Sequence, residues 1–375
     1  MKLEKINRGE LKLLGEIPLL FKLRLKKIFG KKAQSDGGIL AIDVCIIGDF
    51  VGTLPALRTF IENQGEEVDL VVIPPLKSLA QSIRGVRKVF TAKSMYQRTN
   101  ENYEKLESMP ANYSQVMVLR ISPETYQRLN SIKYSKIEIY DIPYFKYCGH
   151  LVKTIMLRKE FKQWSEVNFE MVGIKKPDRK IGFDDIFSFS ESDYARVGEL
   201  PEMDGTSKKI IIHTGSGWNV KLWDNDKWIE LIRKINTLGD FKFILIGASD
   251  LEEKSFNYIQ NHLDFKIFSL INRVDLKTIL LVMRYSDYFI GIDSGPRNLA
   301  HLADLRSITM LGPAPKNFMP MNKNDIVIDK FTCKCKSLYY LHKESAMQKI
   351  SAEEVFEGFM RLSKTDRPHL VYQLG

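Results

Sequence analysis

Residues 209–247 read KIIIHTGSGWNVKLWDNDKWIELIRKINTLGDFKFILIG, and this stretch decides the fold class. Two buried-strand patterns, at 209–215 and 241–247, enclose residues 225–239, whose apolar side chains recur at helical spacing up to Gly239. The alternation continues with strands predicted at 265–270, 288–293 and 307–312 and helices at 252–263, 275–286 and 295–303. Continuous apolar strands that alternate with helices predict a parallel sheet covered on both faces.

A second series of the same kind precedes this one. It has predicted strands at 39–47, 68–74, 86–90, 114–120 and 136–141, and predicted helices at 53–63 and 76–83. The polar stretch 172–209, with Pro177, Pro201 and Gly205, is the best candidate for the connection. We therefore predict an α/β fold of two Rossmann-like doubly wound domains that face a central cleft, with ligands at the carboxyl ends of the strands.

The predicted domain boundaries follow from these patterns. They are a basic amphipathic arm at 1–36, an N-terminal domain at 37–175, a linker at 176–208, a C-terminal domain at 209–350, and a helix and tail at 351–375. The last segment is expected to pack back on the N-terminal domain.

Composition excludes several classes of protein. The 375 residues are 44% hydrophobic and 27% charged, which is typical of a globular chain rather than a disordered one. No apolar run approaches the ~20 residues that span a bilayer. The four cysteines are too few and too uneven for a disulfide framework, which favours a reducing cytoplasm. The net charge of +10 indicates nucleic acid, an anionic membrane surface or polyanionic substrates.

Much of the positive charge lies in the first 36 residues. There the cations alternate with Leu, Ile and Phe: Lys2, Lys5, Arg8, Lys12, Lys22, Arg24, Lys26, Lys27, Lys31 and Lys32. Such a segment can lie on an anionic membrane, with its apolar side in the interface. The alternative is a solvated arm. The membrane interpretation predicts a cytoplasmic protein held peripherally on the inner face of the cytoplasmic membrane.

The loop IIGDFVGTLPAL (46–57) is the first that carries chemistry. Gly48 and Gly52 allow a tight turn, and Asp49 lies between a strand end and a helix start. Aspartate at such a position is either an N-cap or a general base, and the local pattern alone favours the cap.

Two further loops lie in the second series. Gly215, Ser216 and Gly217 follow a strand and could wrap a phosphate, with Lys221 as a point charge for a pyrophosphate. Asp293, Ser294 and Gly295 end a strand and open a helix, where an anion fits or where either polar residue only caps the helix. The nearby Trp223 and Trp228 are expected to pack rather than to stack on a ligand.

These loops, in this order, resemble glycosyltransferase family 9 of bacterial heptosyltransferases, which have the GT-B fold. The motifs are Gly48-Asp49 followed by Thr53-Leu54-Pro55-Ala56-Leu57, His213 to Ser216 continuing to Lys221-Leu222-Trp223, and Asp293 to Ala300 followed by Leu311-Gly312-Pro313. The resemblance runs from about Ile39 to Met360.

The resemblance implies an inverting transferase without a catalytic metal or cofactor. The donor is expected to be a nucleotide-diphosphate sugar, ADP-heptose in the first place, and the acceptor a lipid-linked glycan of the lipopolysaccharide type. Asp49 matches the family's general base, with Gly48, Thr53 and Arg58 on the acceptor side. The donor side comprises Gly215, Ser216, Lys221, Asp250, Val274, Asp293, Ser294, Gly295, Pro296 and Asn298.

The sequence also departs from the family pattern. Asn298 stands where the family has a histidine, next to an unusual Arg297 that we expect to meet the diphosphate. Asp250 and Glu252 both lie near the position of the ribose-binding acid. Cys333 and Cys335, even with His342, fall short of the four ligands of a structural zinc site, which favours free thiols over a metal.

Two other functions stay open. One is a non-catalytic protein that binds nucleotide sugars or acts as a scaffold on a GT-B body. The other is nucleic-acid binding, which the positive charge suggests, but no reading helix or set of stacking aromatics supports it. We predict no nucleic-acid partner.

Overall fold

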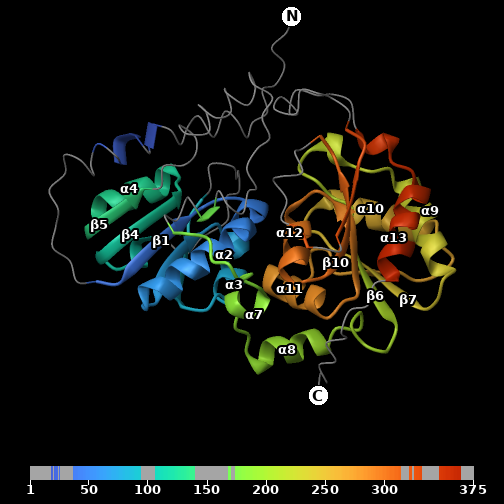
Figure 1. The fold of residues 1–375 in the computed structure, drawn as a ribbon, viewed down its shortest axis with the longest axis horizontal. Coiled ribbons are helices and arrows are strands. Elements are labelled where there is room, and N and C mark those ends of the chain that lie inside the picture. The colour runs from blue at the N-terminus through green and yellow to red at the C-terminus, as the bar shows by residue number, and fades with distance from the viewer. Residues whose placement is uncertain are drawn as a thin grey trace, which may run out of the picture. The chain divides into compact units, whose positions relative to one another are not determined.

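The computed structural model describes residues 37–93, 106–139, 168–169, 174–313, 321–322, 325–331 and 346–364, together with 18, 19, 21–23 and 25. The chain divides into two compact units, Met1–Ser188 and Phe189–Gly375, which we call unit 1 and unit 2 (Figure 1). Among the described residues, no helix has the length and apolar character to span a bilayer.

Unit 1 is built on a parallel sheet. Its elements are β1 (Ile39–Asp43), α2 (Ile47–Gln64), β2 (Val68–Val72), η1 (Pro74–Leu76), α3 (Lys77–Ala80), β3 (Val86–Thr91), η2 (Leu106–Ser108), β4 (Asn112–Arg120), α4 (Pro123–Ser131), β5 (Lys133–Ile139) and α7 (Phe183–Ile186). The strand order is β3-β2-β1-β4-β5, and all pairings are parallel. Right-handed crossovers place α2 and α3 on one face of the sheet and α4 on the other (Figure 1).

Helix α2 begins earlier than the sequence predicts. It starts at Ile47 instead of residue 53, so Asp49 lies in its first turn and not in a loop. Pro55 is inside the helix, two turns from its start, where it gives up one backbone hydrogen bond. The helix ends at Gly65, whose φ of 69° is left-handed and whose N–H donates to the carbonyls of Ile61 and Glu62.

Unit 2 repeats the architecture with a wider sheet. Its elements are α8 (Glu191–Gly198), β6 (Lys208–His213), η3 (Asn219–Lys221), α9 (Asn225–Asn236), β7 (Phe241–Leu245), α10 (Asp250–Asn261), β8 (Phe268–Ser269), α11 (Leu276–Arg284), β9 (Tyr288–Ile292), α12 (Gly295–Leu302), β10 (Arg306–Leu311), β11 (Ile326–Asp329), η6 (Ala346–Lys349) and α13 (Ala352–Ser363). The parallel strands run in the order β11-β10-β9-β6-β7-β8. The predicted fold class, two doubly wound parallel sheets, is confirmed, and the cleft between them stays a prediction.

The core of unit 2 includes the last helix of the described chain. Val355, Phe359 and Leu362 of α13 lie in one hydrophobic cluster with residues of α9, β6, β9 and β10. Trp223 and Trp228 pack edge to face in the same cluster, with ring centroids 4.9 Å apart, as expected. The sequence predicts that 351–375 packs on the N-terminal domain, whereas α13 buries its apolar face in unit 2, because its amphipathic stripe completes the face that α9 covers. Residues 365–375 lie outside the described residues.

The predicted linker at 176–208 is also folded onto its neighbours. Arg84 N–H donates to Ile186 O, and Ser188 N–H donates to Ser82 O, so α7 and the residues after it belong to unit 1. Helix α8 instead packs on α11 in unit 2. The division between the units therefore falls between Ser188 and Phe189.

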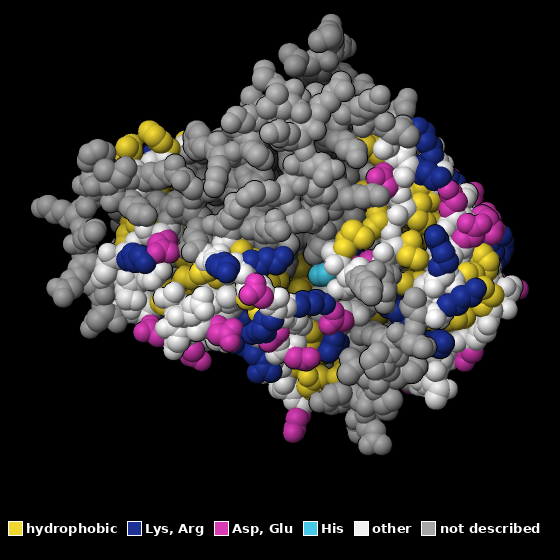
Figure 2. Space-filling model, in the orientation of Figure 1, with side chains coloured by type: hydrophobic (Ala, Val, Ile, Leu, Met, Phe, Trp, Pro, Cys, Tyr) yellow, Lys and Arg dark blue, Asp and Glu magenta, His cyan; other side chains and the backbone are white. Residues whose placement is uncertain are grey.

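The predicted basic arm lies mostly outside the described residues. Of its described side chains, Leu23 is fully buried, whereas Phe21 and Leu25 are 56% and 40% exposed. On the face shown in Figure 2, Lys and Arg side chains are interspersed with Asp and Glu over the described part of both units.

Candidate functional site

The strand order of unit 1 reverses between β1 and β4, and the predicted base lies at this switch point. Asp43, the last residue of β1, pairs with Arg120, the last residue of β4, after a shift of the β1–β4 register at this point. After the short loop that follows β1, α2 begins and carries Asp49 in its first turn. Crevices at such reversals are where doubly wound sheets bind ligands.

The carboxyl group of Asp49 has a raised pKa. Burial raises its pKa above the usual value of 3.8, and the positive charge of Arg120 partly opposes this. Asp49 is not the N-cap of α2, because that residue is Ile46 and no side chain makes a capping hydrogen bond there. The structure therefore does not support the cap interpretation and leaves the general-base interpretation in place.

Sequence reasoning missed the residues that surround Asp49. Asp43 is fully buried, and burial raises its pKa to about 6 despite Arg120; Asp49 adds repulsion. Burial and the two carboxyl groups raise the pKa of the Cys45 thiol, so this free cysteine is not a thiolate nucleophile. The only available signal was an aspartate inside an apolar strand, and its cation, Arg120, lies too far along the chain to be paired by inspection.

The predicted acceptor-side residues separate into two groups. Gly48 precedes Asp49, and Thr53 lies one turn further on, with its hydroxyl donating to Asp49 O at 2.9 Å. Arg58 is nine residues beyond Asp49, which places it on the opposite side of α2 and about 13 Å along its axis. There its Nε donates to Asp185 O of α7 at 2.8 Å. Arg58 therefore joins α2 to α7 and does not lie beside Asp49.

Unit 2 has its own switch point between β6 and β9, and the predicted donor residues gather there. Lys221 Nζ lies 2.5 Å from Asp293 Oδ2 and 3.4 Å from Asp293 O. Both side chains are about 15% exposed, so the pair is accessible. Gly312, after β10, lets the Lys221 side chain pass, because a Cβ there would lie 2.8 Å from Lys221 Cγ. An aspartate thus holds the lysine that is expected to bind a diphosphate at the edge of the sheet where the strands have their carboxyl ends.

A buried histidine links the other loops of this edge. His213, the last residue of β6, has Nε2 3.2 Å from Glu252 Oε1 and Nδ1 3.0 Å from Ser294 Oγ. Gly215 leaves room for this carboxylate, because a Cβ there would lie 2.0 Å from Glu252 Oε1 and would force a shift. Ser294 is the N-cap residue of α12, but its side chain makes no capping hydrogen bond. Sequence reasoning did not assign a role to His213, and it considered Glu252 only as a ligand of the ribose.

The remaining predicted donor residues lie in strand-to-helix connections and helix starts of unit 2. Ser216 Oγ accepts a hydrogen bond from Trp218 N–H at 3.1 Å. Asp250 is exposed at the first position of α10. Val274 is half-buried before α11. Gly295, Pro296 and Asn298 form the start of α12.

Arg297 does not lie where the sequence suggests. Its side chain is 0% exposed, with Nε 3.2 Å from Thr309 Oγ1 and one Nη 3.3 Å from Asp325 Oδ2. Burial lowers its pKa from the usual value. The expectation that Arg297 meets the diphosphate is wrong, because its helical position turns the guanidinium into unit 2, where Asp325 neutralises it.

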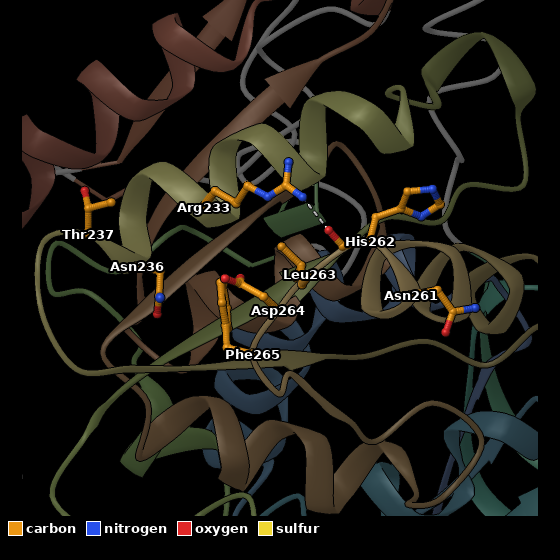
Figure 3. Close-up of a pocket in the computed structure, with 8 residues that line it drawn as sticks. All are labelled: Arg233, Asn236, Thr237, Asn261, His262, Leu263, Asp264 and Phe265. Atoms are coloured by element: carbon orange, nitrogen blue, oxygen red, sulfur yellow. Dashed lines mark hydrogen bonds between the residues drawn. The ribbon is translucent and has the colours of Figure 1, made fainter.

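Two other observations on the described residues concern metal ions and a hollow away from these strand ends. No group of three or more His, Cys, Asp or Glu side chains among them is placed to hold a metal ion, and Cys333 and Cys335 lie outside the described residues. A hollow of about 780 Å³ is lined by Arg233, His262 and Phe265 among others (Figure 3). It lies at the carboxyl ends of α9 and α10, opposite to the strand ends that carry the site.

The chain belongs to glycosyltransferase family 9 (heptosyltransferase), whose model matches residues 150–350. A lipopolysaccharide heptosyltransferase 1 of Campylobacter coli is 27% identical over 152 residues, which are 38% of this chain and 44% of the relative. The chain spans about half the length of the curated relatives it matches.

Solved structures show the same fold. A glycosyltransferase family 9 protein from Veillonella parvula superposes with a TM-score of 0.68 at 13% identity, over 89% of this chain and 100% of that one. The ADP-heptose lps heptosyltransferase II of E. coli gives a TM-score of 0.64 at 14% identity, over 87% and 98%. At these identities the likeness extends to the GT-B architecture and not to substrates.

Proposed function

We propose that the protein is an inverting glycosyltransferase that moves a heptose from ADP-heptose to a lipopolysaccharide-type glycan. The carrying observation is Asp49, a carboxyl with a raised pKa at the switch point of unit 1. A base works best when its pKa lies near the working pH, and burial moves that of Asp49 in this direction. Family membership and the names of the relatives support the donor and acceptor classes.

In this proposal Asp49 takes the proton from an acceptor hydroxyl as its oxygen attacks the anomeric carbon. The bond between that carbon and the diphosphate oxygen breaks, and the electron pair leaves with the diphosphate. Unit 2 stabilises this charge through Lys221 and through the N–H groups and dipole at the start of α12, which Ser294 and Gly295 open. No metal takes part in the proposed step.

The proposal is tested by following ADP release with ADP-heptose and then with other nucleotide sugars. Asp49→Asn is expected to lower turnover by about 10²- to 10⁴-fold, because the acceptor hydroxyl loses its base. ADP binding, measured by calorimetry, should not change. Asp178→Asn, an exposed aspartate of unit 1, is the matched control and should retain activity.

Three outcomes would change the proposal. Full transfer by Asp49→Asn would remove this residue from the role of base. Release with a hexose donor alone would reject heptose and keep the transferase. Nucleotide-sugar binding without turnover of any donor would favour the alternative, a non-catalytic nucleotide-sugar-binding or scaffold protein.

We also propose that residues 1–36 hold the protein on the cytoplasmic face of an anionic membrane. Phe21 and Leu25 are exposed and four residues apart, so they share one helix face beside the exposed Lys22. Phe21→Ser with Leu25→Ser is expected to lower binding to phosphatidylglycerol vesicles in sedimentation, whereas Leu238→Ser, an exposed leucine of unit 2, is not. Unchanged binding after deletion of 1–36 would contradict the proposal.

A further inference from the structure

A chain of three side chains in unit 2 connects the start of α12 to the interior. Ser294 Oγ lies 3.0 Å from His213 Nδ1, and His213 Nε2 lies 3.2 Å from Glu252 Oε1. His213 is 3% exposed and ends β6, and Glu252 is 8% exposed and lies in the first turn of α10. Buried polar groups placed in this way determine one another's hydrogen positions.

Glu252 is fixed as an ionised acceptor at the inner end of this chain. Its Oε2 accepts from Ala248 N–H at 3.2 Å and also from the Ser249 hydroxyl. Although burial alone would raise its pKa, hydrogen bonds from His213 and Ser249 give a net lowering. Gly215 and Gly247 close over the carboxylate, because a Cβ on either would lie within 2.8 Å of it. His213 Nε2 must therefore carry a hydrogen and donate it to Oε1.

The Ser294 hydroxyl has one hydrogen and two acceptors within reach. They are His213 Nδ1 and the carbonyl of Ile292, each 3.0 Å from Oγ. If the hydroxyl donates to Nδ1, the imidazole is neutral. If the hydroxyl donates elsewhere, Nδ1 keeps its contact with Oγ only by carrying a hydrogen itself, which makes an imidazolium. The direction of the Ser294 hydroxyl is thus coupled to the number of protons on His213.

We propose that His213 is a positioning residue that takes up a proton from solvent when a diphosphate binds at the start of α12. The Ser294 hydroxyl then donates to a phosphate oxygen while His213 Nδ1 donates to Ser294 Oγ. This inference rests on the proposed function, because it takes the donor's diphosphate as the anion. It assigns to His213 and Glu252 a role that the sequence motifs do not.

The charges around His213 agree with this assignment. Glu252, from α10, stabilises an imidazolium directly. On the other side Asp293 adjoins Ser294, and Lys221 of η3 neutralises it. Arg297 of α12 is turned inward to Asp325.

The test is calorimetry of ADP binding at pH 7.5 in two buffers that differ in ionisation enthalpy. The difference counts the protons taken up on binding. We expect the unsubstituted protein to take up to one more proton on binding ADP than His213→Asn does. The matched control, His262→Asn, changes a histidine at the other end of unit 2 and should take up as many protons as the unsubstituted protein. ADP's own titration is common to all three and cancels. For the same reason, the affinity of the unsubstituted protein for ADP, relative to that of His213→Asn, should fall by up to about tenfold for each unit by which pH rises.

Ser294→Ala is the second variant, because Ser294 makes no capping hydrogen bond and its loss should not unfold α12. It breaks the link between anion and histidine, so the extra proton uptake should disappear. Equal proton uptake in His213→Asn and the unsubstituted protein, or undiminished uptake in Ser294→Ala, would overturn this inference and leave the transferase proposal intact. A failure of ADP to bind the unsubstituted protein would contradict both.

Discussion

The two switch points have the same topology and opposite electrostatics. At the switch point of unit 1, the carboxyl groups of Asp43 and Asp49 share one cation, Arg120. Burial raises the pKa of both carboxyl groups. At that of unit 2, Lys221 pairs with Asp293, and Glu252 is satisfied by hydrogen bonds that lower its pKa.

This difference shows how one scaffold supports two chemical tasks. Both sheets bring the ends of neighbouring strands together, so each offers a crevice in the same place. Carboxyl groups that lack full compensation are suited to accept a proton. Paired cations, hydroxyls and a helix start are suited to bind an anion. The side chains at the strand ends, and not the fold, distinguish the two halves.

After Asp49→Asn, the largest effect on turnover is expected from removing the cation of unit 2. Lys221→Met should lower kcat by about 10²- to 10³-fold, because the departing diphosphate loses its nearest positive charge. ADP-release kinetics measure the change. Lys234→Met, which removes a lysine paired with Glu353 at 2.6 Å on the surface of unit 2, is the matched control and should stay active. Turnover within twofold of normal in Lys221→Met would show that the pairing with Asp293 is structural only.

The next effect concerns stability in unit 1. Asp43 has a pKa of about 6 when folded and 3.8 as its ordinary value, so between these pH values the folded state binds more protons than the unfolded state. The free energy of unfolding therefore falls as pH rises from about 4 to 6. Asp43→Asn removes this loss and should raise the free energy of unfolding by up to about 3 kcal/mol at pH 8, with no gain below pH 4.

Urea unfolding at pH 4 and pH 8 measures that difference. The control is Asp69→Asn, since Asp69 is equally buried in unit 1 but accepts hydrogen bonds from Arg87 and Tyr113 at 2.9–3.0 Å. Asp69→Asn should lower the free energy of unfolding by about 1–3 kcal/mol, because these hydrogen bonds are weakened or lost. A destabilising Asp43→Asn at pH 8 would mean that Arg120 compensates Asp43 fully.

The smallest effect tests the close packing around Glu252. Gly215→Ala places a Cβ 2.0 Å from Glu252 Oε1 and should lower the free energy of unfolding by about 1–3 kcal/mol. Gly217→Ala, two residues on in the same loop, meets nothing within 4 Å and should change it by less than about 0.5 kcal/mol. Equal effects from both variants would mean that Glu252 moves away easily.

Much of the fold could be predicted because it rests on local patterns. The apolar strands and amphipathic helices of unit 2, including α9 and α11, follow from side-chain periodicity. The start of α2 could not, because Gly48, Gly52 and Pro55 are typical of a loop, and tertiary packing of Phe50, Val51 and Leu54 outweighs their low helix propensity.

The candidate site divides in the same way. By itself the sequence determined the positions of Asp49, Lys221, Asp293 and Ser294, since each lies where a strand gives way to a helix. Only the tertiary structure decided what these residues face: Arg120 beside Asp49, His213 and Glu252 behind Ser294, and Arg297 turned into the core. The physical reason is that a residue's place at a strand end is a local property, whereas its charge partners come from distant strands that become neighbours only when the sheet forms.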